Sequence, residues 1–95
     1  MRAELVNLVT KGKTETVVLL TTDLAELSPE EKVRVVELAV WLVDEGWTVV
    51  TSADSPLAGL VQRAADAMAG SYRTVEDSTD VRIVASARRL PPLIG

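Results

Sequence analysis

The chain has 95 residues and a formal net charge of −4, with 14 acidic and 10 basic side chains. It contains no cysteine and no histidine, which excludes disulfides, thiolate nucleophiles, Cys/His zinc sites and the usual general base at neutral pH. The length suits one domain over residues 1–95, and the acidic balance disfavours nucleic acid as a partner.

The uncharged runs of the sequence are short, and the amino terminus lacks the pattern of a signal peptide. A membrane span needs about 20 apolar residues, more than any run here supplies. We therefore expect a cytoplasmic protein that does not contact membranes. We also expect no metal site, no cofactor and no catalytic residue, which favours a protein that is not an enzyme.

The amino-terminal segment has the pattern of a β-hairpin. Residues 4–9 can form a strand, residues 10–14 form a turn around Gly12, and residues 16–22 form a strongly apolar second strand. Lys11 and Lys13 flank the glycine, as basic residues do in many anion-binding loops. A phosphate loop is followed by a helix, and none is expected here, so solvated lysines are favoured over an anion site.

The centre of the chain predicts a strand, a helix and a second strand. Residues 16–22 and 47–52 are apolar at consecutive positions, which is typical of strands covered by helices on both faces. Between them, Ser28-Pro29-Glu30-Glu31 is a capping box with proline at the first helical position, and Gly46 is suited to end the helix. Such a unit should be parallel and right-handed.

The remaining elements complete the expected fold. A second helix is predicted to begin at Pro56 and to end at Gly70. Residues 71–76 and 81–86 predict an antiparallel hairpin at one sheet edge, and residues 88–95 an extended tail. The predicted fold class is α/β, with a Rossmann-like βαβα core, parallel central strands, antiparallel hairpins at both termini (ββαβαββ) and a mixed sheet.

A ligand site is expected where the two parallel strands end, because ligands of open α/β sheets bind outside the carboxyl ends of the strands. The side chains there are hydroxyls and carboxylates that can bind a sugar or a phosphate. The candidate ligand-binding residues are Thr21, Thr22, Asp23, Thr51, Ser52, Asp54 and Ser55. The alternative is purely structural: Thr22 and Asp23 begin a turn, and Asp54 and Ser55 cap the second helix.

The first helix also has the pattern of a contact surface. Its apolar positions cover an arc of roughly 220° at 100° per residue, too broad for contact with a sheet alone. Trp41 falls in the charged sector, between Arg34 and Glu37. The candidate interface residues are Trp41, Arg34, Glu37 and Leu38. The alternative is that the indole ring only covers the aliphatic parts of its neighbours.

About half of the chain, residues 16–70, resembles the SLOG superfamily, which includes the DNA-processing protein A family and LOG-type nucleotide phosphoribohydrolases. The similar segment is Gly46-Trp47-Thr48-Val49-Val50-Thr51-Ser52-Ala53-Asp54-Ser55-Pro56-Leu57-Ala58. The end Thr21-Thr22-Asp23, followed by the helix start at Ser28, also looks like the family's first strand and loop. The resemblance implies a Rossmann-like scaffold with a nucleotide site.

The chain departs from the family's glycine-rich phosphate loop. Ser52, Ala53 and Pro56 stand where loop glycines are expected, and Ala58 stands in place of the acidic residue. Since proline has no N–H, a phosphate loop of the family's kind is not kept. The sequence thus favours a non-catalytic interaction or regulatory protein, self-associating through the first helix or binding a protein partner. The alternative is a small nucleotide- or phosphate-ligand-binding domain.

Overall fold

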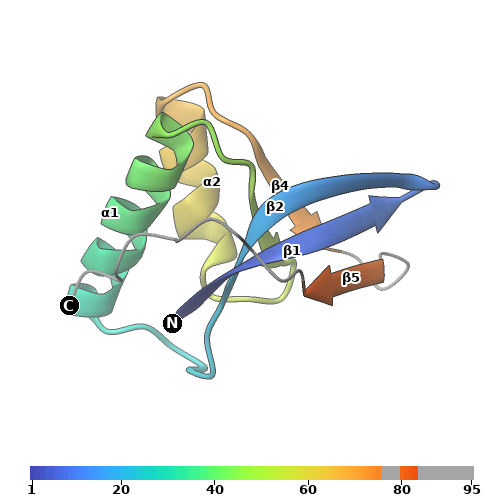
Figure 1. Ribbon diagram of the computed structural model, residues 1–95. Helices are drawn as coiled ribbons and strands as arrows, with labels where there is room; N and C mark the ends of the chain where they lie inside the picture. The colour runs from blue at the N-terminus through green and yellow to red at the C-terminus, as the bar shows by residue number, and fades with distance from the viewer. Residues whose placement is uncertain (76–79, 84–95) are drawn as a thin grey trace.

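The computed structural model describes residues 1–75 and 80–83, which form a five-stranded mixed sheet with two helices (Figure 1). The strand order is β4-β3-β2-β1-β5. In chain order the elements are β1 (Arg2–Thr10), β2 (Lys13–Thr21), α1 (Pro29–Asp44), β3 (Val49–Ser52), α2 (Ala58–Ala67), β4 (Tyr72–Val75) and β5 (Asp80–Ile83). The α/β class and the mixed sheet are confirmed.

The predicted amino-terminal hairpin is present as β1 and β2. The two strands are antiparallel from Arg2, opposite Thr21, to Thr10, opposite Lys13. The loop is therefore Lys11-Gly12, and both residues have positive φ, 51° and 79°. This combination is characteristic of the type I′ turn, whose twist matches that of the flanking strands.

Helix α1 has the predicted ends. The Ser28 hydroxyl accepts a hydrogen bond from the Glu31 N–H, and the Glu31 carboxylate accepts one from the Ser28 N–H, both at 3.2 Å. At the other end, Gly46 has a φ of +87°, and the Trp47 N–H donates to the Leu42 carbonyl at 3.0 Å. These contacts satisfy backbone groups that a helix leaves unpaired at its termini.

The central strands are parallel, as predicted. Val18 and Leu19 of β2 lie opposite Val49 and Val50 of β3. The helix α1 connects these two neighbouring strands, and α2 then connects β3 to the next strand, β4, which is also parallel. The same strand–helix–strand unit is therefore used twice in succession.

The predicted carboxyl-terminal hairpin is wrong. β4 pairs in parallel with β3 at one edge of the sheet, whereas β5 pairs antiparallel with β1 at the opposite edge. The preceding helix α2 returns β4 to the parallel direction, and β1 offers β5 an unpaired edge. The segments 76–79 and 84–86 of the predicted hairpin and the predicted tail 88–95 lie outside the described residues.

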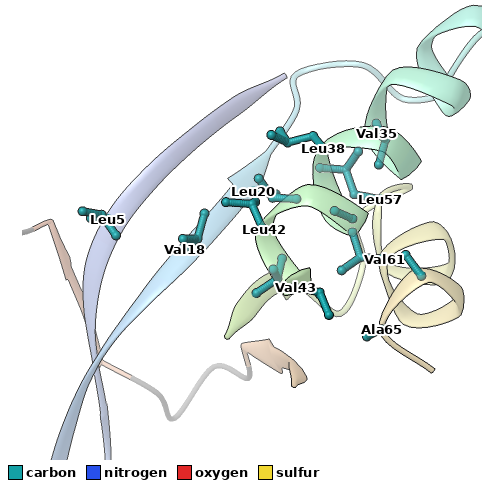
Figure 2. Packing of buried hydrophobic residues seen from close by; sticks show 13 residues of the cluster. Leu5, Val18, Leu20, Val35, Leu38, Leu42, Val43, Leu57, Val61 and Ala65 are labelled. Carbon is teal, nitrogen blue, oxygen red and sulfur yellow. The ribbon is translucent and has the colours of Figure 1, made fainter. Parts of the chain in front are cut away.

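Within residues 1–75 and 80–83, both helices lie on one face of the sheet, so the expected helical cover on both faces is not found there. One core cluster joins buried residues of both helices to Leu5, Val18, Leu20 and Val49 of the sheet, as Figure 2 shows for most of them. The alternate residues of the same strands form a second buried cluster that contains no helical residue from the described ranges. Its buried members are Val6, Leu8, Val17 and Val50.

Curvature of the sheet brings its two edges toward each other beside this second cluster. Outer strands four spacings apart would lie about 19 Å from each other in a flat sheet. Only four residues join Val75 of β4 to Asp80 of β5, and five Cα–Cα steps reach at most about 18 Å. The edges must therefore approach each other, and the β1–β2 hairpin is bent along its length (Figure 1). Val75 and Val81, from the two edges, both pack against the second cluster.

Both ends of α2 differ from the prediction, since the helix begins at Ala58 instead of Pro56. The helix spans Ala58–Ala67, and Ala69, with a φ of 52°, takes the left-handed position that was expected of Gly70. The Gly70 N–H donates to the Ala65 carbonyl at 2.8 Å. Gly70 is needed for a different reason, because a Cβ there would overlap Cγ1 of Val43 and lie 3.1 Å from its Cβ. The glycine lets the chain pass close to α1.

Two adjacent substitutions in this turn should have opposite effects. Ala69→Gly should raise the free energy of unfolding by up to about 1 kcal/mol, because glycine adopts positive φ without a steric penalty. Gly70→Ala should lower it by about 1–3 kcal/mol, because the added methyl group crowds Val43. Urea denaturation of both variants measures the changes, and equal effects in the two would contradict this assignment.

The capping box should make stability depend on pH. Hydrogen bonding with the Ser28 side chain, and then with its backbone, lowers the pKa of the Glu31 carboxyl. A group whose pKa is lower in the folded state stabilises the fold above its unfolded-state pKa and loses this contribution as the pH falls through its folded-state pKa. Wild type should therefore exceed Glu31→Gln in stability at neutral pH, and the difference should shrink in acid.

Urea denaturation at neutral pH and at about pH 3 tests this expectation. Glu30→Gln is the matched control, because Glu30 is also in the first turn of α1 but is not part of the capping box. A difference between wild type and Glu31→Gln that stays constant with pH would contradict the role of the ionised carboxylate.

Candidate functional site

The carboxyl ends of β2 and β3 lie at the same edge of the sheet because the two strands are parallel. The loops that follow them enclose a shallow pocket of about 250 Å³. Five of the residues predicted from the sequence line it together with Leu20 and Pro56: Thr21, Thr22, Ser52, Asp54 and Ser55. The structure therefore brings together residues from two separate loops that the sequence analysis placed in one site.

Two of these hydroxyls accept hydrogen bonds from backbone N–H groups. Thr22 thereby has the turn role given above as an alternative, but the predicted capping of the second helix by Asp54 and Ser55 is wrong, because the N-cap of α2 is Leu57 and no side chain caps it. Thr22 Oγ1 accepts a hydrogen bond from the Leu24 N–H at 3.2 Å, and Ser55 Oγ accepts one from the Leu57 N–H at 3.1 Å. A hydroxyl that accepts a bond from a backbone N–H keeps its own proton for donation. The pocket therefore offers hydroxyl donors beside one carboxylate acceptor, Asp54.

Two predicted residues do not line this pocket. Thr51 is fully buried, and its hydroxyl lies 2.7 Å from the hydroxyl of Tyr72 on β4. Side chains alternate along a strand, so Thr51 lies on the same face of β3 as the buried Val49, which is packed against the helices. Asp23 is exposed, and it is not among the pocket-lining residues.

A second pocket, of about 410 Å³, adjoins the first, since Pro56 lines both. It lies between the segment before α1 and the first turns of α2. Its charged residues are Lys32, Arg63 and Glu26, and its apolar lining includes Leu27 and Leu60. Neither Lys32 nor Arg63 was predicted as a site residue. No local pattern marked them, because Lys32 belongs to α1 and Arg63 lies in the middle of α2, and the packing of the two helices brings them to one pocket.

The predicted contact surface on α1 is only partly available. Trp41 is 39% exposed and Val33 is 56% exposed. Arg34 and Glu37 are exposed as well. Leu38, however, is only 2% exposed and packs in the core between the helix and the sheet. Leu38 is therefore a core residue, and the candidate surface is reduced to Trp41 and its exposed neighbours.

Residues 1–75 and 80–83 contain neither a metal-binding cluster nor a membrane-spanning helix. No cluster of three or more acidic residues is arranged to hold a metal ion there. In the same ranges, no helix combines the length and the apolar character needed to cross a bilayer.

Comparison of the chain with protein-family models, with curated proteins and with solved structures finds no match in any of the three. The resemblance to the SLOG superfamily therefore stays a prediction. The features that bear on function are the two pockets and the exposed surface of α1.

Proposed function

We propose that this chain is a small binding domain that takes a nucleoside or nucleotide at the carboxyl ends of β2 and β3. The observation that carries the proposal is the convergence of Thr21, Thr22, Ser52, Asp54 and Ser55 on one pocket. These residues come from two loops separated by the whole of α1, so their proximity is a property of the fold.

The pocket's chemistry suits a ribose. A carboxylate can accept hydrogen bonds from neighbouring sugar hydroxyls, as acidic residues at the ends of Rossmann-type strands do. Asp54 has this role in the proposal, and the hydroxyls of Thr22 and Ser55 donate to ligand oxygens. Pro56, which is exposed, supplies an apolar contact, whereas Leu20 is fully buried. Binding without catalysis is favoured because the sequence lacks the histidine and cysteine of conventional nucleophile–base pairs.

Adenosine should bind at this pocket, and Asp54→Asn should weaken the binding. In titrations followed by backbone amide NMR, millimolar adenosine should shift the signals of residues 52–55, and wild type should gain thermal stability. The asparagine keeps the shape of the side chain but removes its charge, so the dissociation constant should rise about fivefold or more. Asp23→Asn is the matched control, because it removes the same charge outside the pocket.

The proposal is wrong if millimolar adenosine neither shifts these amide signals nor stabilises the wild type. It is also wrong if Asp23→Asn weakens binding as much as Asp54→Asn does.

A second candidate function is self-association through α1. The observation in its favour is that Trp41 and Val33, two large apolar residues of this helix, are both exposed. Arg34 and Glu37 lie beside them, and aromatic residues surrounded by polar ones are common at the centres of interfaces. The burial of Leu38 removes one predicted contact, which is why this function ranks second.

Analytical ultracentrifugation tests the second candidate directly. If burial of Trp41 and Val33 in a dimer gives a dissociation constant of about 1 µM, wild type should sediment as a dimer at about 100 µM. Trp41→Lys should then be monomeric, because the lysine places an unpaired charge in the interface. Met68→Lys is the matched control, since Met68 is 38% exposed but follows α2. A monomeric wild type would rule out this mode of association.

A further inference from the structure

The pocket beside Lys32 and Arg63 is not explained by binding of an uncharged nucleoside. Ligand pockets usually have volumes of about 300–1,000 Å³. The hydroxyl-lined pocket, at about 250 Å³, is smaller than this range, whereas the adjoining pocket has about 410 Å³. Because Pro56 lines both, a ligand that exceeds the first pocket can extend past this residue into the second.

The charges in the second pocket favour an anionic group. Lys32 of α1 and Arg63 of α2 line it from two different helices. Neither side chain forms an ion pair or a hydrogen bond with another residue of the described ranges. A phosphate bound in this pocket could accept charge-assisted hydrogen bonds from both side chains.

Glu26 lines the same pocket and opposes this effect. Its carboxylate would repel a phosphate, so the pocket's formal charge from Lys32, Arg63 and Glu26 is +1 rather than +2. The net attraction is moderate and should weaken as salt screens it. Removing the charge of Glu26 should therefore strengthen the binding of a phosphate in this pocket.

The loop after β3 offers a phosphate few backbone donors. Proline at position 56 has no N–H, and the Leu57 N–H already donates to the Ser55 hydroxyl. The Ser55 N–H donates to the Ser52 carbonyl at 3.0 Å. A phosphate held near this loop would therefore need donors from elsewhere, and Lys32 and Arg63 line the adjoining pocket, which shares Pro56 with the hydroxyl-lined pocket.

We propose that Lys32 and Arg63 bind the phosphate of a nucleoside monophosphate whose ribose occupies the pocket at Asp54. The inference rests on the proposed function, since it assigns the second half of the same ligand. The phosphate would be recognised by side chains of two helices instead of by the backbone of a glycine-rich loop.

Adenosine and AMP are the probes, and isothermal titration calorimetry at low salt measures both affinities. Wild type should bind AMP about tenfold more tightly than adenosine, because two exposed cations each contribute a modest charge-assisted contact. In the double variant Lys32→Gln/Arg63→Gln this preference should disappear, while the affinity for adenosine stays unchanged. Glu26→Gln should increase the preference for AMP.

Lys13→Gln is the matched control, because it removes one exposed positive charge at the β1–β2 turn, far from both pockets along the chain. It should keep the preference for AMP. Thermal unfolding of each variant checks that the fold is intact, which is expected because Lys32, Arg63 and Glu26 are all exposed.

The possible results separate the two proposals. If adenosine binds but AMP has no advantage in wild type, the phosphate site is wrong and the proposed function stands. The phosphate site is also wrong if the double variant keeps the preference or if Lys13→Gln loses it. If neither compound binds, both proposals fail. Loss of the preference in the double variant alone supports Lys32 and Arg63 as the phosphate ligands.

Discussion

The placement of β2, β3 and β4 side by side in chain order is the constraint on which the rest of the structure depends. Each parallel pair needs a crossover, and two crossovers of the same hand that advance in the same direction put both helices on one face of the sheet. Residues of α1 and α2 accordingly share a single core cluster with that face. The same arrangement brings the loops that lead into the two helices to one edge, where both pockets lie.

Features set by local sequence could be predicted. The capping box at Ser28, the turn at Gly12 and the parallel pairing of β2 with β3 all depend on residues near each other in the chain or on a single crossover. The position of β5 depends instead on an edge left open by β1, far away in the sequence. Runs of apolar residues show that both faces are buried. They do not distinguish burial under a second helical layer from burial inside a curved sheet.

The candidate site also combines features that local sequence predicts with features that depend on residues far apart in the chain. The rule that ligands bind at strand ends selected two loops that line one pocket, because it follows from the direction of the strands alone. The rule did not select individual side chains. Thr51 lies on the face of β3 that packs against the helices, and its hydroxyl is hydrogen-bonded to Tyr72 of β4, a strand whose position in the sheet was not predicted. Lys32 and Arg63 were missed because they belong to helices, and only the packing of α1 against α2 places them at one pocket.

The pairing of β5 with β1 also has a consequence for biosynthesis. β1 begins at Arg2, but its outer edge is paired only when Asp80–Ile83 is available. During translation, a partly synthesised chain would expose this edge, with its free N–H and C=O groups, until Asp80–Ile83 has left the ribosome. The outer edge of β1 is therefore paired later than its inner edge, which pairs with β2, and an unpaired strand edge of this kind is a template for association between nascent chains.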